Sequence, residues 1–167
     1  HFGYDTIYGA KNLPMPKRHY HDISEWSKVN KLYAPKVRRE FQEIYRQSHD
    51  AGKVARFITL LDAHAGHRVL HDIEMAKIHL SDHEDAHIDL KYIENRFNIN
   101  LLRGDFNQSL VSPVTPLTRA VQNCIKISGN TPQDIDLIIL TGGSASIPYV
   151  RETLSQFCPQ AEISQEN

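Results

Sequence analysis

The segment from Leu137 to Pro148, LIILTGGSASIP, constrains the fold of this chain more than any other. Its first four residues, Leu137 to Leu140, are all apolar and predict a short buried strand, which the glycine pair that follows ends. Pro148 suits the first turn of a helix, because its missing N–H costs nothing there. A strand that runs through glycines into a helix leaves backbone N–H groups bare at a sheet edge, which favours a phosphate or a sugar. Many α/β proteins also carry a GG turn with no ligand.

Size and charge narrow the class of protein. With 167 residues, 40% of them hydrophobic, and a formal net charge of −1, the sequence predicts a soluble globular chain of one domain or two small lobes. The balanced charge gives no reason to expect nucleic acid or a membrane surface as a partner. No apolar run approaches the roughly 20 residues of a membrane span, and we expect no signal peptide. Because the sequence opens on His1, we expect a piece of a larger protein.

The two cysteines, Cys124 and Cys158, match no metal or disulfide spacing. Both lie in apolar, helix-like surroundings, which predicts buried free thiols. Free thiols are typical of a reducing compartment, so we expect a cytoplasmic protein.

The first eighty residues have mainly helical periodicity. Apolar residues recur at helical spacing over 22–33, where Trp26 is expected to anchor the core because an aromatic ring buries a large area. Two stronger stretches, 37–47 and 54–80, predict an antiparallel helix pair. Gly66 is expected to bend the second helix or to divide it.

Looser alternation over 84–90 and 97–102 predicts two strands of a small antiparallel sheet with one solvated face. Asp105 is then expected to cap a long helix. Pro113 and Pro116 inside that helix predict a kink or a break, because a proline in a helix interior removes a hydrogen bond.

The chain therefore divides into two predicted parts. Residues 1–104 form a helical lobe with a small antiparallel sheet, and residues 105–167 form an incomplete α/β unit around the glycine turn. In the second part, Gly129 is expected to end the long helix. The stretches 135–140 and 161–164 are expected to be strands. The predicted fold class is α/β, or α+β for the two parts together.

One polar stripe stands out on the predicted helix over 54–80. Glu74 and Lys77 lie at i and i+3, and Ser81 follows at i+7, so all three share one helix face. A carboxylate accepts hydrogen bonds from a sugar diol, lysine donates back, and a serine hydroxyl does either at a purine edge. The alternative is an ordinary exposed face with a weak ion pair, which is common on surface helices.

Three histidines fall at the same kind of spacing. His64, His67 and His71 lie at i, i+3 and i+7, and imidazoles so placed can share a zinc ion. The pattern is not HExxH, no cysteine lies nearby, and ten histidines produce such runs by chance. We therefore expect no metal site, and a zinc ion bound by these three histidines is the lesser alternative.

No catalytic constellation emerges from the sequence. Ser144 follows the glycine pair, but the pattern is not G-x-S-x-G. Neither a P-loop nor G-x-G-x-x-G is present. We expect no catalytic residue in this chain.

Two motifs in this order resemble the second half of the actin-like ATPase domain of DnaK-type, 70-kilodalton heat-shock chaperones. The segment IEMAKIHLS (73–81) is similar to the family's E-x-A-K-x-x-L-S, and DLIILTGGSASIPYVRETL (136–154) is similar to its strand ending in V-G-G-S-x-R-I-P. The opening FGYDTIYGAKNLPMP (2–16), with Trp26, resembles the YegD-like branch. The resemblance covers 54–165 well and the first fifty residues loosely.

The resemblance implies an adenosine site for ATP or ADP between two lobes. Residues 33–104 would be similar to the outer lobe called IIB, and the residues from Asp105 would be part of the inner lobe IIA. By position, Glu74 and Lys77 would bind the ribose hydroxyls and Ser81 the adenine edge. The ribose and phosphate side would be lined by Gly142, Gly143 and Ser144.

Two positions depart from the family pattern. The family commonly has arginine where this chain has Ile78 and Ser146, and those guanidinium groups flank the adenine. Stacking of this kind contributes about 1 kcal/mol or more at each position. The resemblance therefore implies a weakened adenosine site, or one with altered base preference.

The resemblance also implies what the whole protein does. It would be an ATP-dependent chaperone with bound Mg²⁺ and with protein clients or co-chaperones as partners. The family's DxGT phosphate loop, magnesium-binding carboxylates and catalytic lysine belong to parts that precede His1, so this fragment is not expected to hydrolyse ATP. The alternative is a nucleotide-independent protein-interaction lobe.

Overall fold

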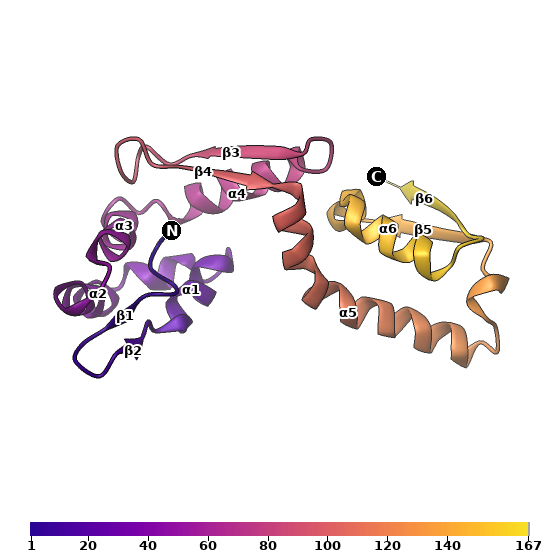
Figure 1. Cartoon of the computed structure of the whole chain (residues 1–167), viewed down its shortest axis with the longest axis horizontal. Coiled ribbons are helices and arrows are strands. Elements are labelled where there is room, and N and C mark those ends of the chain that lie inside the picture. The colour runs from indigo at the N-terminus through magenta and orange to yellow at the C-terminus, as the bar shows by residue number, and fades with distance from the viewer. Residues whose placement is uncertain (167) are drawn as a thin grey trace. The chain divides into compact units, whose positions relative to one another are not determined.

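The computed structural model describes residues 1–166, which divide into two compact units. One unit contains residues 1–75 and 88–99, and the other contains residues 76–87 together with the chain from residue 100 onward. Helices dominate both units, with three two-stranded sheets (Figure 1). The fold is α+β, as predicted. Across the described chain, no helix combines the length and the apolar character of a membrane span.

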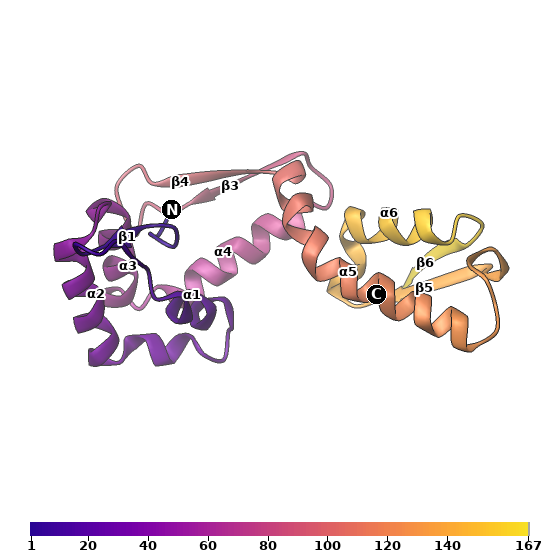
Figure 2. The same cartoon turned by 60° about the horizontal axis from the view of Figure 1, so that its bottom comes forward.

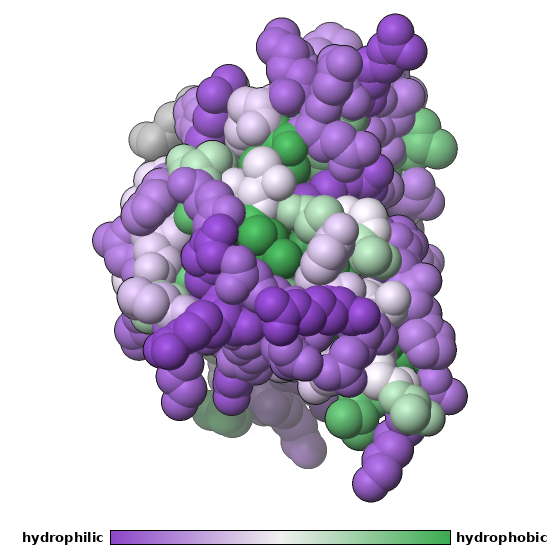
Figure 3. Space-filling model, turned by 90° about the vertical axis from the view of Figure 1, so that its left-hand side faces the viewer, coloured by the Kyte–Doolittle hydropathy of each residue, from purple (hydrophilic) through white to green (hydrophobic). Residues whose placement is uncertain are grey.

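The first half of the chain is mostly helical. Its elements, in order, are β1 (Ile7–Tyr8), β2 (Leu13–Pro14), α1 (Lys17–Ser24), the 3₁₀ helix η1 (Val29–Tyr33), α2 (Pro35–Gln47), α3 (Ala51–Asp62), α4 (Gly66–His79), β3 (Asp85–Asp89) and β4 (Asn98–Leu102). Strands β1 and β2 pair antiparallel, and β3 pairs with β4. One face of the molecule is mostly hydrophilic, with a small apolar area near its centre (Figure 3).

The core of the first unit is built on the contact between α2 and α3. The fully buried rings of Phe41 and Phe57 stack with their centroids 4.3 Å apart. Pro35 occupies the first turn of α2, where its missing N–H is harmless. The Asp50 side chain caps α3 by accepting from the Lys53 N–H. The sequence prediction of a packed helix pair is therefore confirmed.

Gly66 divides the long predicted helix in two, since α3 ends at Asp62 and α4 begins at Gly66 itself. A Cβ at this position would lie 2.6 Å from Cγ1 of Val29 and 2.9 Å from the Tyr33 hydroxyl. That hydroxyl accepts the Gly66 N–H at 3.0 Å and so satisfies an otherwise orphan donor of α4. Only glycine allows η1 to approach the start of α4 this closely.

The predicted helix over 22–33 is wrong. The helix α1 ends at Ser24, and the chain resumes as η1 at Val29. Val29 and Leu32, two of the apolar residues that recur in this stretch, belong instead to the short η1 helix. Both side chains are 0% exposed. Trp26 falls between the two elements and is 59% exposed, so it does not anchor the core.

The β3–β4 sheet matches its predicted alternation. Ala86 and Ile88 of β3 are buried, and the three residues between and beside them are exposed. The turn between the strands is closed by the Leu90 N–H, which donates to the Phe97 carbonyl at 2.9 Å. The sheet therefore has one buried and one solvated face.

The rest of the chain builds a strand–helix–strand motif beside a long helix (Figure 2). Its elements are α5 (Arg103–Ile127), η2 (Pro132–Asp134), β5 (Leu137–Thr141), η3 (Gly143–Ser146), α6 (Pro148–Phe157) and β6 (Glu162–Glu166). The strands β5 and β6 run parallel, with Leu137 opposite Glu162 and Thr141 opposite Glu166. Val114 of α5 and Val150 and Leu154 of α6 form the buried core.

The long helix differs from its prediction at the start. It begins at Arg103 with Leu102 as its N-cap, so Asp105 lies in the first turn and does not cap it. Pro113 and Pro116 both lie inside one continuous helix, which changes direction along its length (Figure 1). Gly129 follows the end with a φ of 76°, as predicted.

The strand β5 and one cysteine are more exposed than predicted. Leu137 is 50% and Ile139 53% exposed, because a sheet of two strands with helices against one face leaves its other face uncovered. Cys158 is buried, and burial raises the pKa of its thiol. Cys124 is exposed, which corrects the prediction of two buried thiols.

Replacing Gly66 by alanine should destabilise the first unit by about 1–3 kcal/mol, because the new methyl group overlaps the fully buried side chain of Val29. Urea unfolding and hydrogen exchange of the α4 amides measure the effect. Gly52→Ala is the matched control: it lies in α3 with its nearest contact at 3.7 Å and should stabilise by about 0.5–1 kcal/mol. Equal behaviour of the two variants would contradict the close packing at Gly66.

Candidate functional site

The predicted polar stripe lies on the second half of α4 and in the turn that follows it. Glu74 is exposed, and Lys77 lies half-buried one turn later. Ser81 lies just beyond the helix, where its N–H donates to the carbonyl of Ile78 at 3.0 Å. A carboxylate, an ammonium and a hydroxyl therefore follow one another along a single helix end, which is a suitable set for a sugar diol and a base.

Arg103 fixes the turn that carries Ser81. Its Nε donates to the carbonyl of Leu80 at 2.9 Å and to that of His83 at 3.0 Å. Its Nη1 lies 2.9 Å from the Glu84 carboxylate. These carbonyls belong to the end of α4 and the segment after it, where helix geometry leaves acceptors unpaired. The sequence prediction missed this arginine, because no local pattern connects residue 103 to residue 80.

The glycine turn leaves its backbone open. Gly142 has φ 84° and ψ 168°, a conformation essentially restricted to glycine. A Cβ on Gly142 or Gly143 would meet no atom within 4 Å, so a ligand can approach the main chain at both residues. Ser144 is exposed, and the Ala145 N–H closes the turn on the Gly142 carbonyl at 2.9 Å.

The two positions that depart from the family pattern have different surroundings. Ile78 is 54% exposed on α4 and offers an apolar side chain to solvent. The Ser146 hydroxyl accepts a hydrogen bond of 2.9 Å from Nε2 of Gln165, a residue of β6. Ser146 is thus held against the neighbouring strand. The sequence prediction did not include Gln165, whose role depends on the parallel pairing of β5 and β6.

An apolar cavity of about 450 Å³ adjoins the glycine turn inside the second unit. Aliphatic residues of α5, β5 and α6 form most of its wall, together with both cysteines. Thr141, Ser144 and Ala145 supply the part of the wall that belongs to the turn. The glycine turn is therefore polar and open, and the cavity beside it is apolar.

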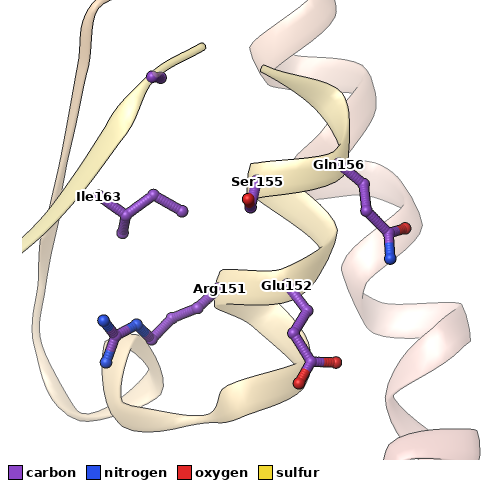
Figure 4. Close-up of a pocket in the computed structure, with 6 residues that line it drawn as sticks. Arg151, Glu152, Ser155, Gln156 and Ile163 are labelled. Carbon is purple, nitrogen blue, oxygen red and sulfur yellow. The ribbon is translucent and has the colours of Figure 1, made fainter. Parts of the chain in front are cut away.

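A second hollow, of about 430 Å³, lies between α6 and β6 (Figure 4). Arg151, Glu152, Ser155 and Gln156 project from α6, and Ile163 lies on the β6 side. The hollow is wide open to solvent, and its charges are of both signs. It offers no set of groups that converge on one ligand.

The zinc alternative does not agree with the structure. His64 precedes α4, has a φ of 50°, and packs its ring on Tyr33 at 4.2 Å, so it leaves the helix face that carries His67 and His71. Within residues 1–166, no three or more His, Cys, Asp or Glu side chains come together as a metal site. The i, i+3, i+7 spacing did not place the three side chains on one face, because Gly66 starts a new helix after His64.

The comparisons with known proteins identify the family. The family model described as "Hsp70 protein" matches residues 49–166, which is more than half of the chain. The chain therefore belongs to the Hsp70 family, and the matched residues are part of its chaperone-type nucleotide-binding domain. The mitochondrial heat shock 70 kDa protein of Solanum tuberosum is 34% identical to this chain over 90 residues.

The aligned part is 50% of this chain and only 13% of that relative's length. The chain thus spans a small fraction of the curated relative that it matches.

Gly142→Ala should destabilise the second unit by about 1–3 kcal/mol, because alanine is strained at a φ of 84°. Gly143→Ala is the matched control: its φ is not positive, its surroundings are equally open, and its stability should change by less than about 0.5 kcal/mol. Urea unfolding and hydrogen exchange of the α6 amides compare the two. A Gly142 variant as stable as the Gly143 variant would show that the turn relaxes without strain.

Proposed function

We propose that this chain is the adenosine-binding half of an Hsp70-type nucleotide-binding domain and that its ligand is ATP or ADP. The observation that carries the proposal is the Glu74, Lys77 and Ser81 stripe at the end of α4 in a chain of this family. Glu74 and Lys77 bind the ribose hydroxyls, and Ser81 binds the adenine edge.

The glycine turn takes the ribose and phosphate side of the same ligand. Gly142 and Gly143 present bare backbone, and Ser144 adds an exposed hydroxyl. The turn follows the carboxyl end of a parallel strand, the position at which open α/β sheets generally bind ligands. The open backbone of the turn supports this assignment.

The whole protein is proposed to be an ATP-dependent chaperone of the YegD-like branch, with Mg²⁺ bound by residues outside this chain. Residues 1–104 act as its IIB-like lobe and residues 105–167 as part of its IIA-like lobe. Protein clients or co-chaperones are its partners. The chain by itself supplies adenosine contacts and no catalytic group, so hydrolysis depends on the rest of the protein.

Calorimetric titration of ADP into the chain tests the ribose contacts. Glu74→Ala combined with Lys77→Ala should weaken binding by at least about tenfold, because each charged hydrogen bond contributes on the order of 1.5–3 kcal/mol. The control, Lys36→Ala with Glu152→Ala, removes the same two charges from exposed positions elsewhere. Equal affinity of both double variants would place adenosine away from α4. Absence of heat in every protein would favour a lobe that works without nucleotide.

Restoring arginine at the two divergent positions tests the adenine side. Ile78→Arg with Ser146→Arg should strengthen ADP binding by about fivefold or more, since one stacked guanidinium contributes about 1 kcal/mol or more. Ile78→Lys with Ser146→Lys adds the same charge without a planar group and is the control. Equal gains from arginine and lysine would show that charge alone, and not stacking on adenine, strengthens binding.

A further inference from the structure

The first half of α4 carries two histidines that are not part of the proposed nucleotide site. His67 and His71 lie at i and i+4 and so share one face of the helix. His67 is half-buried and His71 is exposed. In the part of the chain that the structure describes, neither imidazole takes part in a hydrogen bond or an ion pair. Their ring nitrogens are thus available to a ligand.

Trp26 fixes the orientation of the first of these rings. The indole of Trp26 and the imidazole of His67 meet edge to face, with centroids 4.9 Å apart and planes at 71°. A ring in such a contact loses little further side-chain freedom on binding a ligand, which lowers the entropic cost. Through this contact Trp26, from the segment between α1 and η1, lies beside the start of α4.

The charges around the pair favour a cation. Arg68, the nearest cation in sequence, places its guanidinium over the ring of Tyr92, 3.8 Å from the ring centroid. Glu74 follows one turn after His71 on the same helix and adds negative charge. An imidazole pair with an adjacent carboxylate suits a divalent transition metal, whereas Mg²⁺ and Ca²⁺ require oxygen ligands.

A second pair with the same spacing shows what such a site needs. The rings of His79 and His83 stack face to face at 3.8 Å with only 4° between their planes, and Nδ1 of His83 lies 3.2 Å from the His79 carbonyl oxygen. The lone pairs of two parallel rings do not converge on one point. Spacing alone therefore does not make a metal site.

We propose that His67 and His71 form a solvent-open, two-imidazole site for a divalent transition-metal ion, with water completing the coordination. Copper binds most tightly, followed by nickel and zinc, according to the general order of affinities for nitrogen ligands. The two ligands, His67 and His71, are not among the residues proposed to bind the nucleotide, whereas Glu74, which is, contributes only its charge. The existence of the metal site therefore does not depend on nucleotide binding.

Quenching of tryptophan fluorescence tests the site directly, because Trp26 is the only tryptophan and it touches His67. Cu²⁺ and Ni²⁺ are titrated into the full chain without a histidine tag, in a His1→Ser background that removes chelation by an N-terminal histidine. We expect saturable quenching that is reversed by competition with diamagnetic Zn²⁺.

His71→Ala is the decisive variant, since it removes one ligand and keeps the contact between His67 and Trp26. The metal affinity should fall by more than about tenfold, and circular dichroism should be unchanged. His83→Ala removes a histidine of the stacked pair and should titrate like the parent. Absence of saturable quenching, or equal affinity of the parent and His71→Ala, would overturn the proposal. Loss of quenching in His83→Ala alone would also overturn it.

Discussion

The close contact between Gly66 and η1 is the constraint on which the α4 helix depends. Val29 is fully buried, and the Tyr33 hydroxyl accepts the first N–H of the helix, so the helix can start at only one residue. Each residue of a helix turns by 100°, so the starting residue sets the direction of every later side chain. The directions of the His67 and His71 side chains and of the Glu74 and Lys77 side chains both follow from this one contact.

A comparable constraint shapes the second unit. Two parallel strands need a crossover, and α6 supplies it between β5 and β6. The helix starts at Pro148, only seven residues after β5 ends at Thr141, so the chain must turn sharply in between. Gly142 makes that turn with a positive φ, and the result is bare backbone at the carboxyl end of a strand. The topology of the strand pair therefore creates the open edge that a phosphate or sugar prefers.

Membership of the Hsp70 family and the chemistry of the site support a consistent interpretation of function. Glu74, Lys77 and Ser81, which are proposed to bind adenosine, follow one another along the end of α4. Ile78 and Ser146 stand where the resemblance implies arginines beside the adenine. Ile78 offers apolar surface, and Ser146 is engaged by Gln165. The proposed site therefore has groups suited to the sugar and lacks the two cations that would flank the base. The same helix also carries the histidine pair, so both proposed sites lie along α4.

Local sequence patterns determined many of the structural features of this protein. The α4 stripe, the β3 alternation, the Gly129 helix end and the strand–glycine–helix segment all follow from spacing and from the special conformations of glycine and proline. Such features depend on neighbours in sequence, which a sequence shows directly. Two of these features, the α4 stripe and the strand–glycine–helix segment, also carry the resemblance to the family.

Tertiary structure decided the features that join distant residues. The largely exposed ring of Trp26 packs against His67, and Arg103 fixes the end of α4. Both contacts arise because folding brings together segments that no sequence periodicity connects. His64 does not share a helix face with His67 and His71, because Gly66 packs against η1 and starts a new helix after it, and the His64 ring packs on Tyr33 instead. β5 is half exposed because burial depends on how many elements cover a strand, and an apolar pattern does not encode that number. The sequence alone thus determined the local chemistry, and only the packing decided which of those groups meet.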